Sequence, residues 1–272
     1  MRFFVRFLPV LMIGLLCASS GFAETGSLPP SRGVITYSGV TGMFLNPTSG
    51  TPAKGSLTTQ ACIGDYSWGN EKIEYTAGII TYGVTDDIEL GWTHNRDRHP
   101  KASLNHDWAG PHARFRLLRE TRTSPEVSVG GISLRGQLMH QRDDWFLALS
   151  KRLSKPTCRR GLRLHLGMKG SSMNGESFRS YFAAKKQPWH RGMSKSHVNV
   201  VYGGLEYSLS DAISLITEVS TKGDDHYPKT PWAAGFQYKK PGQNFGCTLS
   251  LVQTGYLNTP KVYFGIGINF DG

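Results

Sequence analysis

Residues 261–270 alternate without a break between apolar side chains and small or polar ones. The apolar positions are Val262, Phe264, Ile266, Ile268 and Phe270, and the positions between them are Tyr263, Gly265, Gly267 and Asn269. Because successive side chains of a β-strand point to opposite faces, this segment forms a strand with one apolar face. Strands that are apolar towards lipid and small or polar towards a lumen are typical of outer-membrane β-barrels.

The first 23 residues have the organisation of a secretory signal peptide. Arg2 and Arg6 precede an apolar run from Leu8 to Cys17, which is too short to cross a bilayer as a helix. Gly21 and Ala23 predict cleavage after Ala23 and Sec-type export, with an uncleaved anchor as the alternative. No other long apolar run follows, so strands are expected to make any membrane crossing. They must close into a barrel, because lipid does not tolerate open sheet edges.

Twelve alternating segments follow residue 55, each close to the roughly 9–11 residues that a tilted membrane strand needs. They span 56–67, 72–84, 87–95, 110–119, 125–136, 143–153, 161–171, 198–208, 212–222, 231–240, 245–255 and 261–270. We therefore predict an all-β chain, with an antiparallel transmembrane β-barrel of about twelve strands over 56–272. Residues 24–55 would be a periplasmic N-terminal segment or a plug. A soluble periplasmic β-sandwich is the alternative.

The lengths of the connections predict which end of the barrel faces the periplasm. Short turn sequences occupy 85–87, 210–211 and 241–244. The longer connections are 94–107, 136–143, 171–197 and 222–230. Outer-membrane barrels have short periplasmic turns and longer outer loops. We therefore expect both termini in the periplasm and the protein in the outer membrane of a Gram-negative bacterium.

Charged side chains concentrate on the predicted inner faces, because Arg or Lys facing lipid near the bilayer midplane costs about 2–4 kcal/mol. The basic set is Arg114, Arg116, Arg163, His165 and Lys169, with Glu89 and Glu218 as counter-charges. One interpretation is a basic lumen that binds an acidic ligand through guanidinium contacts. The other is an internal salt-bridge network that fills a narrow barrel.

The predicted outer loop 171–197 mixes aromatic and basic side chains, among them Lys185, Lys186 and Trp189. Rings beside cations suit sugars that carry carboxylate or phosphate, whereas a solvated loop over the barrel mouth is the alternative. Without the signal peptide the chain holds 29 basic and 20 acidic residues, a net charge of +9. This charge favours anionic partners: outer-membrane lipid, lipopolysaccharide and acidic polysaccharide. Nucleic acid is not expected as a partner, because the chain is exported and has no binding motif.

No catalytic motif is recognisable in the sequence. There is no Gly-x-Ser-x-Gly elbow and no His-Glu-x-x-His, and no serine stands out beside His112 or His165. We therefore expect neither enzyme activity nor a cofactor.

Metal binding and disulfide formation have little support. His94, Asp97, His99 and His106 share a predicted outer loop but fit no metal-ligand pattern. Cys62, Cys158 and Cys247 could form one disulfide with one thiol left over. Cys62 and Cys247 lie in strand patterns, where cysteine ordinarily packs as a small apolar residue.

Residues 40–57 read VTGMFLNPTSGTPAKGSL. The Gly42, Leu45, Pro47-Thr48 and Gly55 positions resemble the entry motif of YjbH-like outer-membrane proteins. Residues 82–91 and 204–211 are similar to strand–turn–strand units common in such barrels. The match covers a minor part of the chain, and known members of the family are longer. The resemblance implies an outer-membrane protein connected with polysaccharide production or export, and it supplies no catalytic residues.

The sequence therefore favours a non-enzymatic outer-membrane barrel associated with exopolysaccharide production or export, with a basic lumen for acidic ligands. A small anion-preferring porin is the first alternative. An outer-membrane lipid hydrolase and a structural barrel with a filled lumen are the others.

Overall fold

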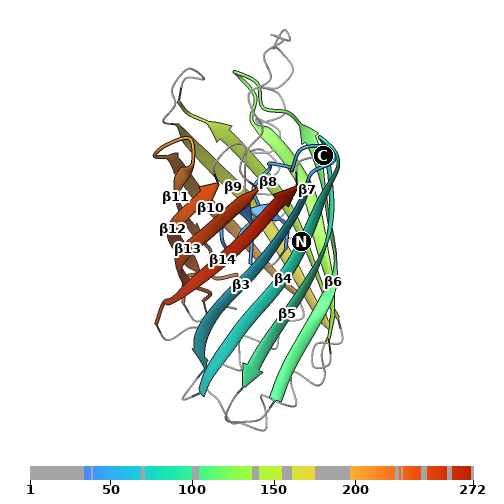
Figure 1. Cartoon of the computed structure of the whole chain (residues 1–272), viewed down its shortest axis with the longest axis vertical. Coiled ribbons are helices and arrows are strands. Elements are labelled where there is room, and N and C mark those ends of the chain that lie inside the picture. The colour runs from blue at the N-terminus through green and yellow to red at the C-terminus, as the bar shows by residue number, and fades with distance from the viewer. Residues whose placement is uncertain are drawn as a thin grey trace.

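The computed structural model describes residues 34–37, 39–68, 71–99, 104–136, 141–154, 161–174, 197–223, 227, 229–239, 244–255 and 259–270 (Figure 1). Twelve antiparallel strands form a closed barrel in which each strand pairs with its neighbours in the chain. The strands are β3 (Leu57–Trp68), β4 (Glu71–Thr85), β5 (Ile88–His99), β6 (Leu104–Leu118), β7 (Glu126–Gly136), β8 (Gln141–Arg152), β9 (Leu162–Asn174), β10 (His197–Ser208), β11 (Ile213–Ser220), β12 (Trp232–Lys239), β13 (Phe245–Gln253) and β14 (Lys261–Phe270). The predicted fold class is confirmed.

The barrel closes between its first and last strands. β14 pairs with β3 from Tyr263 opposite Gly64 to Phe270 opposite Leu57. The ring of Tyr263 lies directly over Gly64, where an added Cβ would stand 2.7 Å from a ring carbon. The glycine thus makes room for a large inward ring at the seam that joins the two ends of the sheet.

The side chains that alternate in the sequence point alternately to the outside and to the lumen of the barrel, with the apolar ones outside. On β14 the apolar set is exposed, from Val262 at 58% to Phe270 at 49%, whereas Tyr263 is buried. On β9, Leu166 is exposed and His165 is completely buried. The apolar face therefore surrounds the barrel and suits a lipid environment.

The β5–β6 pair extends furthest beyond the bounds that the sequence predicts. Residues 94–107 were expected to form an outer loop, but β5 continues to His99 and β6 begins at Leu104. In this part of β5 the outward positions change from Trp92 to Arg96 and Arg98, so hydrophobic alternation stops while strand pairing continues. Arg96 donates to Asp107 at 2.6 Å across the β5–β6 pair.

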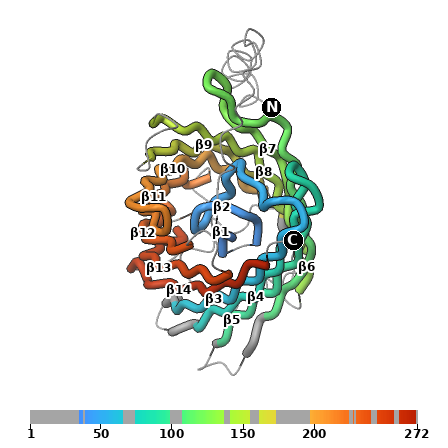
Figure 2. The backbone as a smooth tube through the Cα atoms, turned by 45° about the horizontal axis from the view of Figure 1, so that its top comes forward, coloured from blue at the N-terminus to red at the C-terminus, as the bar shows by residue number. Residues whose placement is uncertain are grey.

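The lumen is occupied by the chain itself. Figure 2 shows β1 (Val34–Ile35) and β2 (Thr41–Gly42) inside the ring of strands. We call residues 34–55 the plug, with residue 38 outside the described part of the chain. The barrel core is formed where apolar plug side chains pack on inward apolar groups of the wall. The plug side contributes Ile35, Tyr37, Met43 and Phe44, and the wall side includes Ile79, Tyr202, Ile216 and Tyr263.

Cys62 and Cys247 are both free thiols. Cys62 is buried on an inward position of β3, whereas Cys247 shares the β13 face of the exposed Phe245 and Leu249. Their side chains therefore point to opposite sides of the wall. Cys158 lies outside the described residues. Within the described residues no helix is long and apolar enough to cross a membrane.

The lipid-facing assignment makes a quantitative prediction for Phe264, which lies mid-strand between Leu249 and Ile63 of the neighbouring strands. Phe264→Arg should lower the free energy of unfolding in lipid by about 2–4 kcal/mol, because the guanidinium would face hydrocarbon. Urea titration in vesicles measures the change. Asp211→Arg, in the exposed β10–β11 turn, is the control and should have little effect. Equal effects of the two substitutions would contradict the lipid-facing assignment.

Candidate functional site

Two buried carboxylates of the wall bind main-chain amides of the plug. Glu218 on β11 accepts hydrogen bonds from Phe44 N at 2.9 Å and Leu45 N at 2.6 Å. It also accepts one from the Asn46 amide at 2.7 Å. Glu89 on β5 accepts a bond from Thr41 N at 3.1 Å and is completely buried. Hydrogen bonds to an ionised acceptor are stronger than neutral ones, so these carboxylates are principal anchors of the plug.

Two wall cations bind plug carbonyls in the same region. Arg114 on β6 is completely buried and donates to the carbonyl oxygens of Thr41 and Gly50. Its guanidinium also lies over the ring of Phe146, 5.3 Å from the centroid. Lys169 on β9 donates to Leu45 O at 3.3 Å. The plug main chain therefore supplies acceptors to wall cations as well as donors to wall carboxylates.

Neutral contacts hold the remaining part of the plug. The hydroxyl groups of Tyr37 and Ser250 lie 2.5 Å apart, and Tyr75 donates to Tyr37 O at 2.6 Å. Gln60 donates to Ile35 O at 3.0 Å. These contacts come from β3, β4 and β13, on the wall next to the seam. The plug is thus attached to strands on several sides of the barrel.

The plug continues into β3 at one end of the barrel, which is the end that carries the short β4–β5 turn. Gly55 N donates to Gly83 O at 2.7 Å, Gly83 N donates to Ser56 O at 2.9 Å, and Lys54 N donates to Asp86 at 3.1 Å. An added Cβ on Gly83 would stand 2.1 Å from Ala53 O, so only glycine allows this approach. In outer-membrane barrels such short turns face the periplasm.

Asp87 organises the same turn. It accepts bonds from Arg119 at 2.8 Å and from Arg116 at 2.8 Å. Hydrogen bonding to Arg119, and next to Arg116, holds the pKa of the Asp87 carboxyl below its usual value. The stabilisation from this contact is therefore present above the pKa of the unfolded chain and is lost as the pH falls through the lowered pKa.

Among the described residues, the inner wall has a balance of charges rather than a basic surplus. Arg163 donates to Glu120 at 2.9 Å, and Arg116 lies 3.9 Å from Glu126. Arg142 lies 2.7 Å from Asp144. The expectation of a basic lumen is therefore corrected, because it counted only Glu89 and Glu218 as acids. The alternation of side chains along the strands would have identified two further inward acids. Glu126 shares the inward face of β7 with Ser128, and Glu206 shares the inward face of β10 with Tyr202.

Sequence reasoning also missed a serine beside His165. Ser150 on β8 is directly opposite His165 in the β8–β9 pairing, and its hydroxyl lies 2.7 Å from Nδ1. Nε2 of the same ring lies 3.3 Å from Glu206 on β10. Ser150 also accepts a bond from Ser49 N of the plug at 3.2 Å. The pairing register that brings these residues together cannot be read from segment patterns alone.

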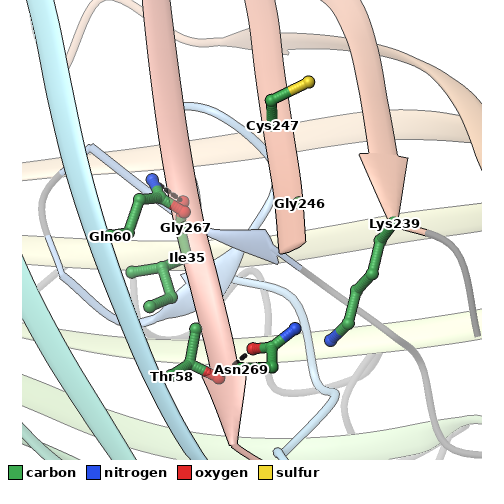
Figure 3. A pocket seen from close by; sticks show the side chains of 8 residues that line it. All are labelled: Ile35, Thr58, Gln60, Lys239, Gly246, Cys247, Gly267 and Asn269. Atoms are coloured by element: carbon green, nitrogen blue, oxygen red, sulfur yellow. Dashed lines mark hydrogen bonds between the residues drawn. The ribbon is translucent and has the colours of Figure 1, made fainter. Parts of the chain in front are cut away.

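A small cavity remains beside the plug, between Ile35 and the wall near the ends of β12 and β14. Figure 3 shows Gln60, Thr58, Asn269 and Lys239 around it, with Thr58 donating to Asn269 at 2.5 Å. Its volume is ≈ 20 Å³, little more than one water molecule requires. This cavity between described residues is therefore too small for a sugar.

Three of the predicted ligand-binding residues, Lys185, Lys186 and Trp189, lie outside the described residues. The group of histidines and Asp97 in the predicted outer loop does not form one cluster, because neighbouring strand positions point to opposite faces. His94 is on the outward face of β5 and Asp97 is on the inward face. Within the described part of the chain no three His, Cys, Asp or Glu side chains are grouped to hold a metal ion.

Comparisons with known proteins concern the fold. No protein-family model matches the sequence, and no curated protein matches it. An outer membrane channel from Pseudomonas putida F1 superposes with a TM-score of 0.52 at 9% identity, over 81% of this chain and 97% of that one. The KdgM porin gives 0.48 at 7% identity, over 80% and 99%. Omp33 of Acinetobacter baumannii gives 0.48 at 10%, over 81% and 100%. The closed antiparallel sheet and the superposition on the Pseudomonas putida channel show that the chain has the fold of outer-membrane β-barrels.

The anchoring geometry predicts the effect of neutralising one carboxylate. Glu218→Gln should destabilise the protein by about 1–3 kcal/mol, because three donors lose a charged acceptor in a buried site. It should also increase proteolysis within residues 34–55. Denaturant titration and limited proteolysis in detergent measure the two effects.

Glu74→Gln is the matched control. Glu74 is 44% exposed and lies 3.5 Å from Arg98, so its replacement should change stability by no more than about 0.5 kcal/mol. If both substitutions leave the plug equally protected, Glu218 is not an anchor.

Proposed function

We propose that the protein is an outer-membrane barrel that serves the production or export of an acidic exopolysaccharide, with the plug as its closed resting state. The principal role is passage or assembly rather than catalysis. The resemblance of residues 40–57 to YjbH-like proteins supports the link to polysaccharide. The barrel fold supports the location in the outer membrane.

The single observation that supports a closed resting state is that charged side chains of the wall bind the main chain of the plug. Glu89, Arg114, Lys169 and Glu218 all bind main-chain atoms of residues 41–50. Hydrogen bonds of this kind can be exchanged for those of another polar chain, and a polysaccharide presents donors and acceptors at similar density. Without the plug, side chains of both charges would line one polar passage. Arg114 and Glu89 are an example, since they lie 3.9 Å apart on the wall.

A small porin is the second candidate, favoured by the polar inward face of the strands. The charge balance of the described wall favours weak ion selectivity over the anion preference expected from the sequence. Conductance therefore separates the two candidates, because a simple porin conducts without release of the plug.

The plug should control conductance in planar bilayers. We expect small conductance for the native chain and larger, more frequent openings for Glu218→Gln, because the plug is then held less firmly. Asn46→Cys with Ser220→Cys, in a chain whose native cysteines are replaced by Ala, places two thiols where side chains now lie 3.1 Å apart. Oxidation should close the channel, and reduction should reopen it. A steady native conductance that ignores this crosslink would show an open porin.

The same locked variant tests the biological role. Cells in which it replaces the native protein should lose acidic polysaccharide from their surface, because the plug cannot leave the lumen. Quantifying surface uronic acid measures the loss, and the single variant Ser220→Cys is the control. Unchanged polysaccharide in cells with a demonstrably oxidised lock would refute the export role.

A further inference from the structure

Ser150, His165 and Glu206 form a continuous hydrogen-bonded row across three neighbouring strands of the inner wall. Ser150 Oγ lies 2.7 Å from His165 Nδ1, and His165 Nε2 lies 3.3 Å from Glu206 Oε2. Ser150 and His165 are almost completely buried, at 1% and 0% exposure. The second oxygen of Glu206 accepts a bond from Ser214 at 3.2 Å, which fixes the carboxylate in turn.

The hydrogen bonds assign the protons in this row. Glu206 can only accept when ionised, so the ring nitrogen that faces it carries the proton. In the neutral ring Nδ1 is then an acceptor, and Ser150 must donate its hydroxyl proton to it. Ser150 Oγ is free to do so because its contact with Ser49 uses a lone pair: Ser49 N donates at 3.2 Å. The serine hydroxyl therefore points at a basic nitrogen whose ring is oriented by a carboxylate.

We propose that Ser150, His165 and Glu206 are a hydrolytic site for acyl esters, opened when the plug leaves the lumen. A nucleophile within hydrogen-bond reach of a base, with the base oriented by a third group, is the arrangement of serine hydrolases on unrelated folds. This inference adds a chemical step to the proposed function. It also revises the expectation that the chain lacks a serine–histidine pair.

The reaction needs only water as co-reactant. Ser150 Oγ attacks the ester carbonyl carbon while its proton moves to His165 Nδ1. The bond from this carbon to the alcohol oxygen then breaks, and His165 returns the proton to the departing alcohol. Water, deprotonated by the same nitrogen, attacks the acyl-serine, releases the carboxylic acid and restores the hydroxyl group.

We assign the stabilisation of the developing oxyanion to a buried cation on the same strand face. Arg163 lies two residues from His165 on the inward side of β9 and is 9% exposed. Its Nη2 donates to Glu120, whereas Nη1 has no hydrogen-bond partner among the described residues. An unused, buried N–H donor of a cation is what an oxyanion requires.

The position of the row defines the substrate class. Access is from the polar lumen, so the ester must be carried by a polar molecule rather than by a membrane lipid. On the proposed function, this molecule is a polysaccharide that bears O-acyl groups. The plug contacts the nucleophile directly, because Ser49 N donates a hydrogen bond to Ser150 Oγ at 3.2 Å.

The test uses the full chain folded in detergent, a fluorophosphonate probe and p-nitrophenyl acetate. Glu218→Gln, which loosens the plug, should form a covalent adduct at Ser150 by peptide mass spectrometry, at least about tenfold faster than the native chain. Adding Ser150→Ala should abolish this adduct. Adding His165→Gln should slow ester hydrolysis by about 10²–10⁴-fold.

Ser128→Ala is the matched control in the same background. Ser128 is a buried inward serine of β7, and its hydroxyl has no hydrogen-bond partner among the described residues. Its loss should leave adduct formation and hydrolysis unchanged. Retention of the barrel in each variant is checked by heat-modifiable migration on a gel.

The outcomes separate this inference from the proposed function. An adduct at Ser150 without plug-dependent conductance supports the hydrolytic site and argues against passage. Plug-dependent conductance without an adduct supports passage and overturns the site. Hydrolysis that survives Ser150→Ala also overturns it, because the activity then has another source.

Discussion

The structure depends on the mutual satisfaction of buried charges and buried main-chain groups inside the barrel. An ionised group removed from water is costly unless it is paired or hydrogen-bonded, and so is an unpaired amide or carbonyl. Glu218 and Arg114 belong to the first kind, and the main chain of residues 41–50 belongs to the second. Each supplies what the other lacks. The polar wall and the plug are therefore one interdependent unit, and neither is explained without the other.

The outer surface obeys a separate constraint, so the two faces of each strand have different compositions. Towards lipid only apolar side chains are inexpensive, as Leu166 and Phe264 illustrate. Towards the lumen the wall must match a specific neighbour. This explains the large residues Tyr202 and Tyr263 beside small ones such as Gly64 and Gly204, since a Cβ on Gly204 would stand 2.2 Å from the sulfur of Met43.

The sequence predicts the strands well because lipid imposes a period of two on every membrane-spanning segment, as residues 261–270 show. It fails where that constraint ends. Beyond Trp92 neither face of β5 is apolar, so the sequence predicts a loop where the strand continues to His99. The inward direction of Arg114, Arg163 and Lys169 was predictable from alternation, but their partners were not. Arg114 and Lys169 bind main-chain oxygens, which every residue carries, and Arg163 binds the Glu120 side chain. The contact of His165 with Ser150 depends in turn on the pairing register of β8 and β9.

The place of the plug in the chain has a consequence for assembly. Residues 34–55 immediately precede β3. β3 pairs with β14, which is the last strand of the barrel in the sequence. Tyr37 packs against Tyr263 of this last strand, with ring centroids 5.0 Å apart. The plug thus lies against the joint that completes the cylinder. The segment that fills the interior is made first, and the strand that encloses it is made last, so biogenesis can enclose the contents as the wall closes instead of inserting them into a finished pore.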